Sequence, residues 1–181
     1  MEFAAQAIGI LAMLVNIVSY QFKSRKNVLF CMFAGSTLFA VNMFMIGAVM
    51  GGILNIVGIA RALVYINKDK LKIPIKLLNT LFILVYAASY ALSFTVFNTE
   101  PILKNFILEL LPAIGMSVMT IALSGNDAKK IRLLGFVNSP CWLIYNCFNF
   151  AVGGILCEVF SLVSITAAFI RIDIMSKKEK V

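Results

Sequence analysis

The sequence predicts an all-helical membrane protein with seven transmembrane helices, arranged as two parallel three-helix units and one connecting helix. Three observations lead to this prediction: the composition, the spacing of the apolar runs and the one-sided distribution of basic residues. Of the 181 residues, 61% are hydrophobic and 13% are charged, whereas soluble domains have about 45–50% and about 25%. Mean hydropathy is +0.96. This composition excludes a water-soluble domain, a disordered chain and a nucleic-acid-binding module, and we expect one membrane domain.

The apolar runs give the number of spans. A helix needs about 20 apolar residues to cross the hydrocarbon core, and charges and turn residues divide the chain into seven such runs. No basic segment or cleavage site accompanies the first run, so we expect a retained span rather than a signal peptide. Tight glycine turns are expected at residues 47–52 and 152–154. The predicted spans cover residues 3–22, 27–46, the first turn to 66, 76–97, 102–123, 130–150, and the second turn to 170.

The basic residues support this count and give an orientation. Of the 16 Lys and Arg residues, all but Lys104 and Arg61 fall on one face of a seven-span arrangement, whereas a six-span arrangement scatters them. Cytoplasmic loops carry such an excess of positive charge, so we expect the N-terminus outside and the C-terminus in the cytoplasm. The net charge of +8 then reports topology rather than an anionic partner. We expect the basic tail, residues 174–181, to contact anionic lipid head groups.

A short identity suggests an internal repeat. Gly51-Gly52-Ile53-Leu54 and Gly153-Gly154-Ile155-Leu156 each follow a basic loop and a span that contains an asparagine, Asn42 or Asn146. Copies four spans apart have the same orientation, so the repeat is parallel, and binding sites of such proteins lie between the halves. The predicted units are residues 1–67 and 102–173, with residues 68–101 as the linker helix.

Three charged residues lie within predicted spans. Glu109 and Glu158 are each about 9–10 Å deep at about 1.5 Å per residue, and Arg61 lies nearer the cytoplasmic side. Insertion of an Arg or Asp at the centre of a helix costs about 2.5–3.5 kcal/mol. Such residues face the bundle interior or a wet cavity and are candidates for function. We therefore expect all three to bind substrate.

A structural role is the alternative for these charges. Arg61 paired with one carboxylate would hold two helices in register. Two carboxylates and one arginine leave one acid without a fixed cation, however, and that acid would be protonated, bind a cationic substrate or relay protons. The sequence therefore permits proton coupling without requiring it.

The sixth predicted span carries a polar stripe. Asn138, Trp142, Tyr145 and Asn149 share one helical face, and Asn146 lies beside it. Aromatic rings and amides suit a planar or hydroxylated solute. Hydrogen bonds between helices, together with an aromatic belt at the membrane interface, are the structural alternative. We expect Trp142, Tyr145, Asn146 and Asn149 to contact substrate.

Glycine and proline shape the remaining candidate positions. Asn55 shares a face of the third span with Gly51 and Gly58, and we expect the asparagine to contact substrate and the glycines to permit close helix packing. Pro112 and Pro140 each remove a backbone donor inside a span and should kink it. Each kink is either a hinge for alternating access or a feature of shape alone.

Metal, cofactor and enzymatic chemistry are not expected. The chain has no His and four Cys, and the cysteines sit in apolar runs without a CxxC pair, as small buried hydrophobes do. A zinc site is therefore not predicted. A membrane enzyme needs a nucleophile or base within reach of an acid or metal, and the sequence offers no such set.

Several segments resemble one known family. In the second half they are residues 109–115, residues 141–146, and Gly153-Gly154 followed by Glu158; in the first half they are the basic loop after the first span, Gly47-Ala48 and Arg61. Together they resemble the YgjV family of bacterial inner-membrane proteins over nearly the whole chain. That family is distantly similar to the SWEET, PQ-loop and PnuC transporters. The resemblance implies a three-one-three helix plan in the inner membrane and a small-solute transporter. The proline-glutamine pair of the PQ-loop group is absent, and no substrate carries over.

The favoured function is therefore a transporter or facilitator of a small polar or cationic metabolite, with alternating access between the two units. A non-transporting scaffold or receptor with a closed polar network is the alternative. The expected partners are a small polar solute and the lipid bilayer, without nucleic acid. A monomer suffices to bury the interior, and small lipid-facing residues leave a homo-oligomer open.

Overall fold

The computed structural model describes residues 2–19, 25–97, 99–125 and 128–170, and every regular element in these ranges is a helix. The prediction of an all-helical protein is thus confirmed. The predicted basic tail lies outside the described residues. The helices in chain order are α1 (Glu2–Ser19), α2 (Arg25–Met45), α3 (Val49–Ile66), α4 (Lys68–Leu71), α5 (Ile75–Thr95), α6 (Leu103–Ser124), α7 (Ala128–Phe148) and α8 (Val152–Ala168).

The seven long helices follow the predicted spans, but two predicted turns are wrong. Gly51-Gly52 and Gly153-Gly154 lie inside the first turns of α3 and α8 rather than between helices. Glycine is common in turns, but it also lets a neighbouring helix approach closely. In α3 and α8 the glycine pairs serve this close approach. The short α4 was also not predicted, because its sequence, Lys68–Leu71, has the charges of a loop.

The actual turns before α3 and α8 have the same hydrogen bonds. The N–H of Ala48 donates to Met43 O over 2.9 Å, and the N–H of Ala151 donates to Asn146 O over 3.0 Å. One residue earlier, Gly47 and Phe150 both have positive φ, at 80° and 52°. The turns match residue for residue when Ala48 is aligned with Ala151. This register pairs Gly51 with Gly154 and differs by one residue from the register of the sequence identity. The internal repeat itself stays a prediction.

Three helices, α3, α5 and α6, are long and apolar enough by themselves to cross a membrane. Residues 2–18, 30–45 and 152–168 form shorter apolar helices. Large apolar side chains also cover the outside of the bundle; Leu84 is 60% exposed and Val163 is 62% exposed. An apolar outer surface of this kind fits lipid rather than water. That all seven long helices span the membrane stays a prediction.

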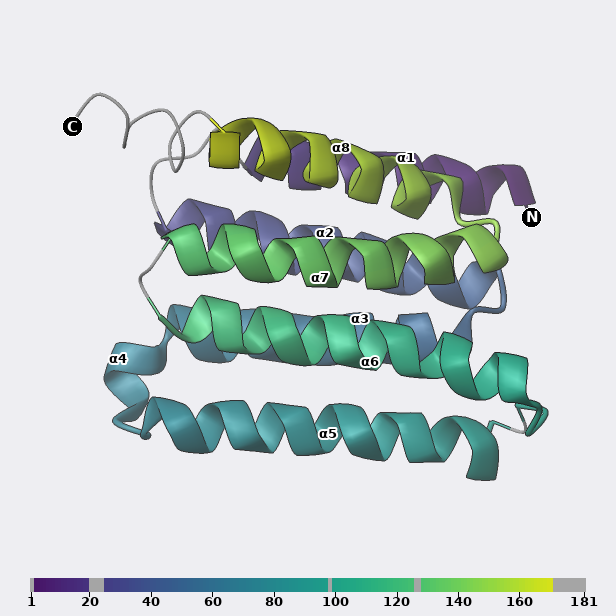
Figure 1. The fold of residues 1–181 in the computed structure, drawn as a ribbon, viewed down its shortest axis with the longest axis horizontal. Helices are drawn as coiled ribbons and strands as arrows, with labels where there is room; N and C mark the ends of the chain where they lie inside the picture. The colour runs from purple at the N-terminus through teal and green to yellow at the C-terminus, as the bar shows by residue number, and fades with distance from the viewer. Residues whose placement is uncertain (1, 20–24, 98, 126–127, 171–181) are drawn as a thin grey trace.

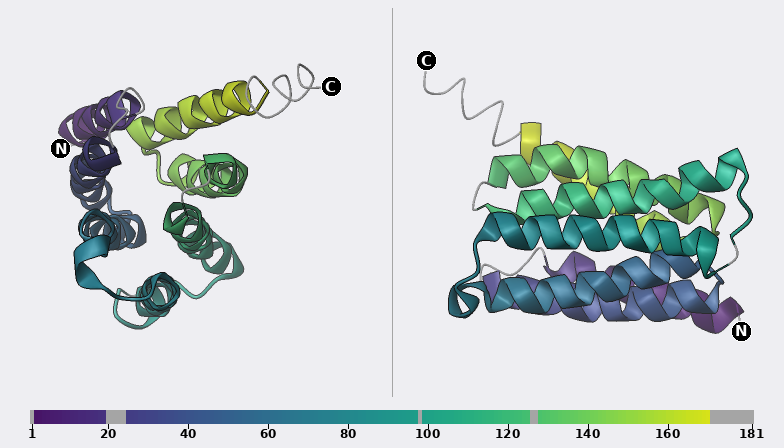
Figure 2. Two further views of the ribbon diagram at one scale, coloured as in Figure 1. Left: turned by 90° about the vertical axis from the view of Figure 1, so that its left-hand side faces the viewer. Right: turned by 90° about the horizontal axis from the view of Figure 1, so that it is seen from below.

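The helices form one layer of parallel and antiparallel neighbours wrapped into a ring (Figures 1 and 2). Around this ring α1 contacts α2, α2 contacts α3, α3 contacts α6, α6 contacts α7, α7 contacts α8, and α8 returns to α1. The connecting helix α5 packs against both α3 and α6. In Figure 1, α1 and α6 run in the same direction, as do α2 and α7, and α3 and α8. A parallel repeat requires these directions.

The two ends of the bundle differ in charge. We call the end that holds α4, the start of α5 and the start of α7 the basic end, because Lys70, Lys72, Lys76 and Lys130 lie there (Figure 1). The opposite end holds the N-terminus and the turns before α3 and α8, and we call it the N-terminal end. Lys104, at the start of α6, lies at this second end.

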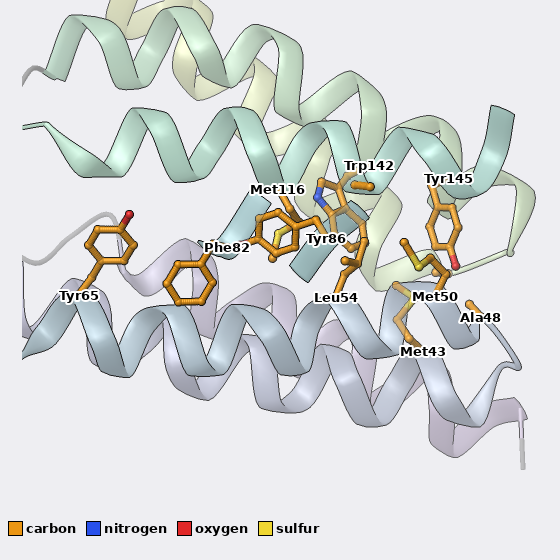
Figure 3. Packing of buried hydrophobic residues seen from close by; sticks show 12 residues of the cluster. Met43, Ala48, Met50, Leu54, Tyr65, Phe82, Tyr86, Met116, Trp142 and Tyr145 are labelled. Atoms are coloured by element: carbon orange, nitrogen blue, oxygen red, sulfur yellow. The ribbon is translucent and has the colours of Figure 1, made fainter. Parts of the chain in front are cut away.

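The core is a row of large side chains inside the ring. Figure 3 shows them along the bundle axis, from Tyr65 near one end to Tyr145 and Ala48 near the other. They come from α2, α3, α5, α6 and α7 and from the two turns. A second, smaller cluster joins α1, α2 and α8 and contains Ala12, Met13, Phe39 and Cys157. Most of the polar groups described below line the first cluster.

Candidate functional site: a polar interior between α3 and α6

Arg61 is the buried cation of the site. It lies on α3 and is 6% exposed. Its Nη1 donates to Met116 O over 3.3 Å and to Thr120 Oγ1 over 3.0 Å, both on α6. Among the described residues no carboxylate pairs with it, so these residues do not form the ion pair that was the structural alternative for Arg61. The guanidinium instead joins α3 to α6 through neutral oxygens.

Thr120 connects this cation to α5. Its hydroxyl has one proton, which it donates to Met116 O over 2.8 Å. It therefore accepts from its other two partners, which are Arg61 Nη1 and the Tyr86 hydroxyl at 3.1 Å. Thr120 and Tyr86 are each 0% exposed. The cluster thus holds two donors, one of them charged, aimed at a single neutral oxygen.

An aromatic column continues from this cluster toward the basic end. The rings of Tyr65, Phe82 and Tyr86 stack in sequence, with centroids 6.2 and 6.4 Å apart. The Tyr65 hydroxyl donates to Asn79 Oδ1 over 2.6 Å, so its polar end is satisfied on α5. Figure 3 shows the three rings in a row that leads from Tyr65 to Tyr86. All three rings are buried, and Tyr65 lies close enough to Arg61 to interact with it electrostatically.

Tyr145 and Glu109 form the polar part of the interior near the N-terminal end. The Tyr145 hydroxyl accepts the Gly51 N–H over 2.9 Å. Gly51 lies in the first turn of α3, where backbone N–H groups have no partner within the helix. The carboxyl group of Glu109 lies close enough to act electrostatically on the Tyr145 hydroxyl. Glu109 Oε2 is sealed from solvent and has no hydrogen-bond partner among the residues that the structure describes.

Depth explains why Glu109 and Arg61 do not meet. Glu109 precedes Thr120, the partner of Arg61, by three helical turns on α6, which is about 16 Å at about 1.5 Å per residue. Glu158 is placed differently again, because the Ser139 hydroxyl of α7 hydrogen-bonds to it. Ser139 and Tyr145 lie about 120° apart around α7. The structure therefore does not bring the two glutamates together around one shared cation.

The polar residues predicted to form one stripe on α7 face different parts of the structure. Trp142 and Tyr145 pack edge to face inside the ring, with centroids 5.9 Å apart. Asn146 is 2% exposed and faces α8, where an added Cβ on Gly154 would lie 2.6 Å from its Nδ2. Asn149 donates to Tyr145 O of its own helix over 2.9 Å. The two aromatic residues thus belong to the interior, and Asn149 serves the helix end. Asn146 faces α8, and its Oδ1 is buried without a hydrogen-bond partner among the described residues.

Asn55 and the two prolines have local roles in this structure. Asn55 Nδ2 donates to Gly51 O, four residues earlier on α3, over 2.8 Å. The helices α6 and α7 continue through Pro112 and Pro140. Whether these prolines act as hinges stays a prediction. Of the predicted set, Arg61, Glu109, Trp142 and Tyr145 therefore line the interior between α3 and α6.

Sequence reasoning missed Thr120, Tyr86, Tyr65, Asn79 and Ser139. Tyr86 and Asn79 lie on α5. The predicted repeat treats this helix as the linker between the two units, so its residues were not considered as site residues. Thr120 is an isolated hydroxyl in an apolar helix and has no pattern of its own. The sequence did contain one indication of the Arg61–Thr120 contact. Arg61 lies about 7.5 Å from the end of α3, and Thr120 lies about 6 Å from the end of α6. Both helices end at the basic end of the bundle, so the two residues lie at a similar depth.

A shallow cavity of about 340 Å³ opens at the N-terminal end. It is lined by Lys104, Cys147, Phe148 and Phe150. The Lys104 ammonium lies 5.1 Å from the centre of the Phe148 ring, within cation–π range. Among the residues that the structure describes, no group of three or more His, Cys, Asp or Glu side chains is placed to hold a metal ion.

Comparison with known proteins decides the family. Residues 3–176 match the model of a family described as Imp-YgjV, bacterial inner membrane protein. The chain belongs to this family. The resemblance to YgjV proteins is thereby confirmed over nearly the full length, and the chain is a bacterial inner membrane protein. No curated protein and no solved structure matches it. The family description assigns neither a substrate nor an enzymatic activity.

Proposed function

We propose that this Imp-YgjV protein transports, or facilitates the passage of, a small polar solute across the bacterial inner membrane. The solute moves between the α1–α3 half and the α6–α8 half, along the interior between α3 and α6. The proposal is non-enzymatic. The single observation that carries it is a buried cation and a sealed carboxylate oxygen in one interior, at different depths and without charged partners among the described residues.

Physical cost is the reason that these groups favour transport. Unpaired buried charges oppose folding and insertion by several kcal/mol. A bundle that only needed stability would replace Arg61 and Glu109 by apolar residues. In a transporter, in contrast, the polar groups that bind the solute have no fixed charged partner while the solute is absent. Glu109 suits a cationic group or a transferred proton, so proton coupling belongs to the same proposal.

A scaffold or receptor is the second candidate, and the packing of the interior favours it. Twelve buried residues form the main cluster, and the Arg61–Thr120–Tyr86 hydrogen bonds are internal to the protein. A receptor would bind its ligand at these groups without moving it across the membrane. Flux measurements separate the two functions.

The test is solute flux in proteoliposomes over a panel of neutral, cationic and anionic metabolites. We expect the wild-type protein to raise the flux of at least one solute above protein-free liposomes. Glu109→Gln should lower it about tenfold or more, because a charged hydrogen bond contributes about 1.5–3 kcal/mol. Glu100→Gln is the matched control, since Glu100 is exposed in a loop. Flux equal to that of empty liposomes over the whole panel would overturn the proposal.

The orientation is part of the proposal: the basic end faces the cytoplasm and the N-terminus lies outside. Cys147 is exposed near the N-terminal end and reports this directly. In a variant that keeps only this cysteine, an impermeant maleimide should label intact spheroplasts. A cysteine introduced at Lys129 should be labelled only after the membrane is opened. The reverse pattern contradicts the orientation.

A further inference from the structure

The Arg61 guanidinium has no counter-ion among the described residues. Its two hydrogen bonds both come from Nη1 and end on neutral oxygens, Met116 O and Thr120 Oγ1. The described residues offer no hydrogen-bond partner to Nε or Nη2. Glu109 is about three helical turns away along α6, and Glu158 is bound by Ser139. Within the part of the chain that the structure describes, no negative charge compensates this buried cation.

The neighbours of Arg61 leave part of the guanidinium without an acceptor. Because Thr120 gives its only proton to Met116 O, the Tyr86 hydroxyl donates to Thr120 beside the guanidinium. The protons of both hydroxyls are therefore engaged inside the cluster. The donors that have no partner among the described residues are Nε and Nη2 of Arg61, and a negatively charged acceptor would satisfy them.

The chemistry of the missing acceptor follows from three features. A guanidinium is a flat fork that matches the two oxygens of a carboxylate. Arg61 is a single cation, so it neutralises one negative charge rather than a phosphate dianion. The stacked rings of Tyr65, Phe82 and Tyr86 belong to the buried core on the same side of the interior, so an apolar part of the ligand would suit these surroundings better than a polar one.

We propose that Arg61, held in place by Thr120, binds a small monocarboxylate that has an apolar part through its Nε and Nη2 groups. This inference rests on the proposed function and names the substrate class for the basic-end half of the interior. Arg61 lies about 7.5 Å from the end of α3, next to the basic end with Lys70, Lys72 and Lys130. Their positive field concentrates small anions at the entrance.

The first experiment compares two ligands of one shape on the wild-type protein. Purified protein in detergent is titrated calorimetrically with benzoate and with its neutral isostere, benzamide, at pH 7. Benzoate should bind about tenfold more tightly or better, because only the carboxylate pairs with the guanidinium. Benzoate should also bind more tightly than acetate, which lacks the ring. Equal binding of benzoate and benzamide, or binding of neither, would overturn the proposal.

The second experiment assigns the effect to Arg61. R61Q and R61M remove the charge, and R61M keeps most of the apolar stem. Each should lose the preference for benzoate over benzamide. Lys104→Gln is the matched control, because it removes a cation at the opposite end, and it should keep the preference. An unchanged preference in R61M contradicts the proposal. Circular dichroism verifies folding, and if neither Arg61 variant folds, the wild-type ligand pair decides.

Flux measurements keep this inference separate from the proposed function. If a neutral or cationic solute crosses but benzoate does not bind, the protein is a transporter and the carboxylate site is wrong. If benzoate binds through Arg61 but no solute crosses, the site stands and the protein is a receptor. Benzoate flux that is lost in R61M supports both.

Discussion

The two places where the first half, α1–α3, meets the second half, α6–α8, are built from different groups. At the α1–α8 contact, backbone meets backbone. At the α3–α6 contact, long polar and aromatic side chains fill the space between the helices. Both contacts join the same two halves. The difference shows how one ring combines a contact held by backbone packing with a contact made by polar and aromatic side chains.

The α1–α8 contact is fixed by glycine. A Cβ added to Gly153 would lie 2.1 Å from the carbonyl carbon of Gly9, so no other residue fits there without moving a helix. Gln6 of α1 ties the end of this contact: its Oε1 accepts the Val152 N–H over 3.0 Å, and its Nε2 donates to Phe150 O over 2.9 Å. Backbone contacts of this kind leave no room for a solute.

The α3–α6 contact depends on side chains. Gly58 of α3 faces the flexible end of Met116, and Arg61 bridges to α6 through hydrogen bonds. Carrying the offset between Ala48 and Ala151 back along the chain pairs Gln6 of α1 with Glu109 of α6. Gln6 has partners for both of its polar atoms, whereas Glu109 Oε2 has none among the described residues. The proposed path follows the α3–α6 contact because the polar group without a partner lies there.

The largest expected effect is at the fixed contact. Gly153→Ala should destabilise the protein by about 3 kcal/mol or more or prevent folding, because the new Cβ overlaps backbone that cannot move alone. Thermal unfolding in detergent, followed by circular dichroism, measures this. Gly58→Ala is the matched control, since its Cβ would meet side chains rather than backbone, the Met116 methyl at 3.2 Å and Ser36 Oγ at 3.4 Å, and it should cost about 1 kcal/mol or less. Equal costs for the two variants would contradict the distinction between the contacts.

A smaller loss is expected where Tyr145 meets α3. Tyr145→Phe removes the acceptor of the Gly51 N–H and should cost about 1–2 kcal/mol, because this buried donor then has no partner. The same thermal assay applies. Tyr90→Phe serves as control: the Tyr90 hydroxyl donates to Phe106 O over 3.3 Å at an exposed position, and its loss should be close to zero. A Tyr145→Phe variant as stable as wild type would show that another group serves Gly51.

Glu109→Gln should change stability in the opposite direction. Replacing an acid that has a sealed, unpartnered oxygen by a neutral amide removes part of the burial cost, and we expect a gain of about 1 kcal/mol. The thermal midpoint of the variant reports this gain, and Glu100→Gln should leave the midpoint unchanged. A clear loss of stability in Glu109→Gln would mean that the carboxylate is held by the fold rather than kept for a ligand.

The smallest effect is expected at Gln6. Gln6→Ala removes two partly exposed hydrogen bonds and should cost about 0.5–1 kcal/mol. Gln6→Glu keeps an acceptor for the Val152 N–H and places a negative charge at the N-terminus of α8, so it should cost less than Gln6→Ala. Midpoints from thermal unfolding rank the two variants. If Gln6→Glu is the more damaging one, the bond to Phe150 O is the important contact.

Sequence alone determined the helices. Apolar runs and charges placed the ends of the seven long helices within a few residues, because a helix in a membrane satisfies its own backbone and needs no distant partner. The YgjV resemblance was also carried by local motifs. The glycine pairs were misplaced into turns because their use, close approach to Gly9 by Gly153 and to Tyr145 by Gly51, involves helices that are distant in sequence.

Only the tertiary structure decided the partners of the polar residues. Arg61 and Glu109 were recognised as candidates from their charge, but the sequence could not show that one bonds to Thr120 and the other to none. Asn146 and Tyr145 are neighbours in sequence, yet one faces α8 and the other α3. The rotation of each helix about its axis sets these contacts, and that rotation is fixed by side-chain packing between helices rather than by any local pattern.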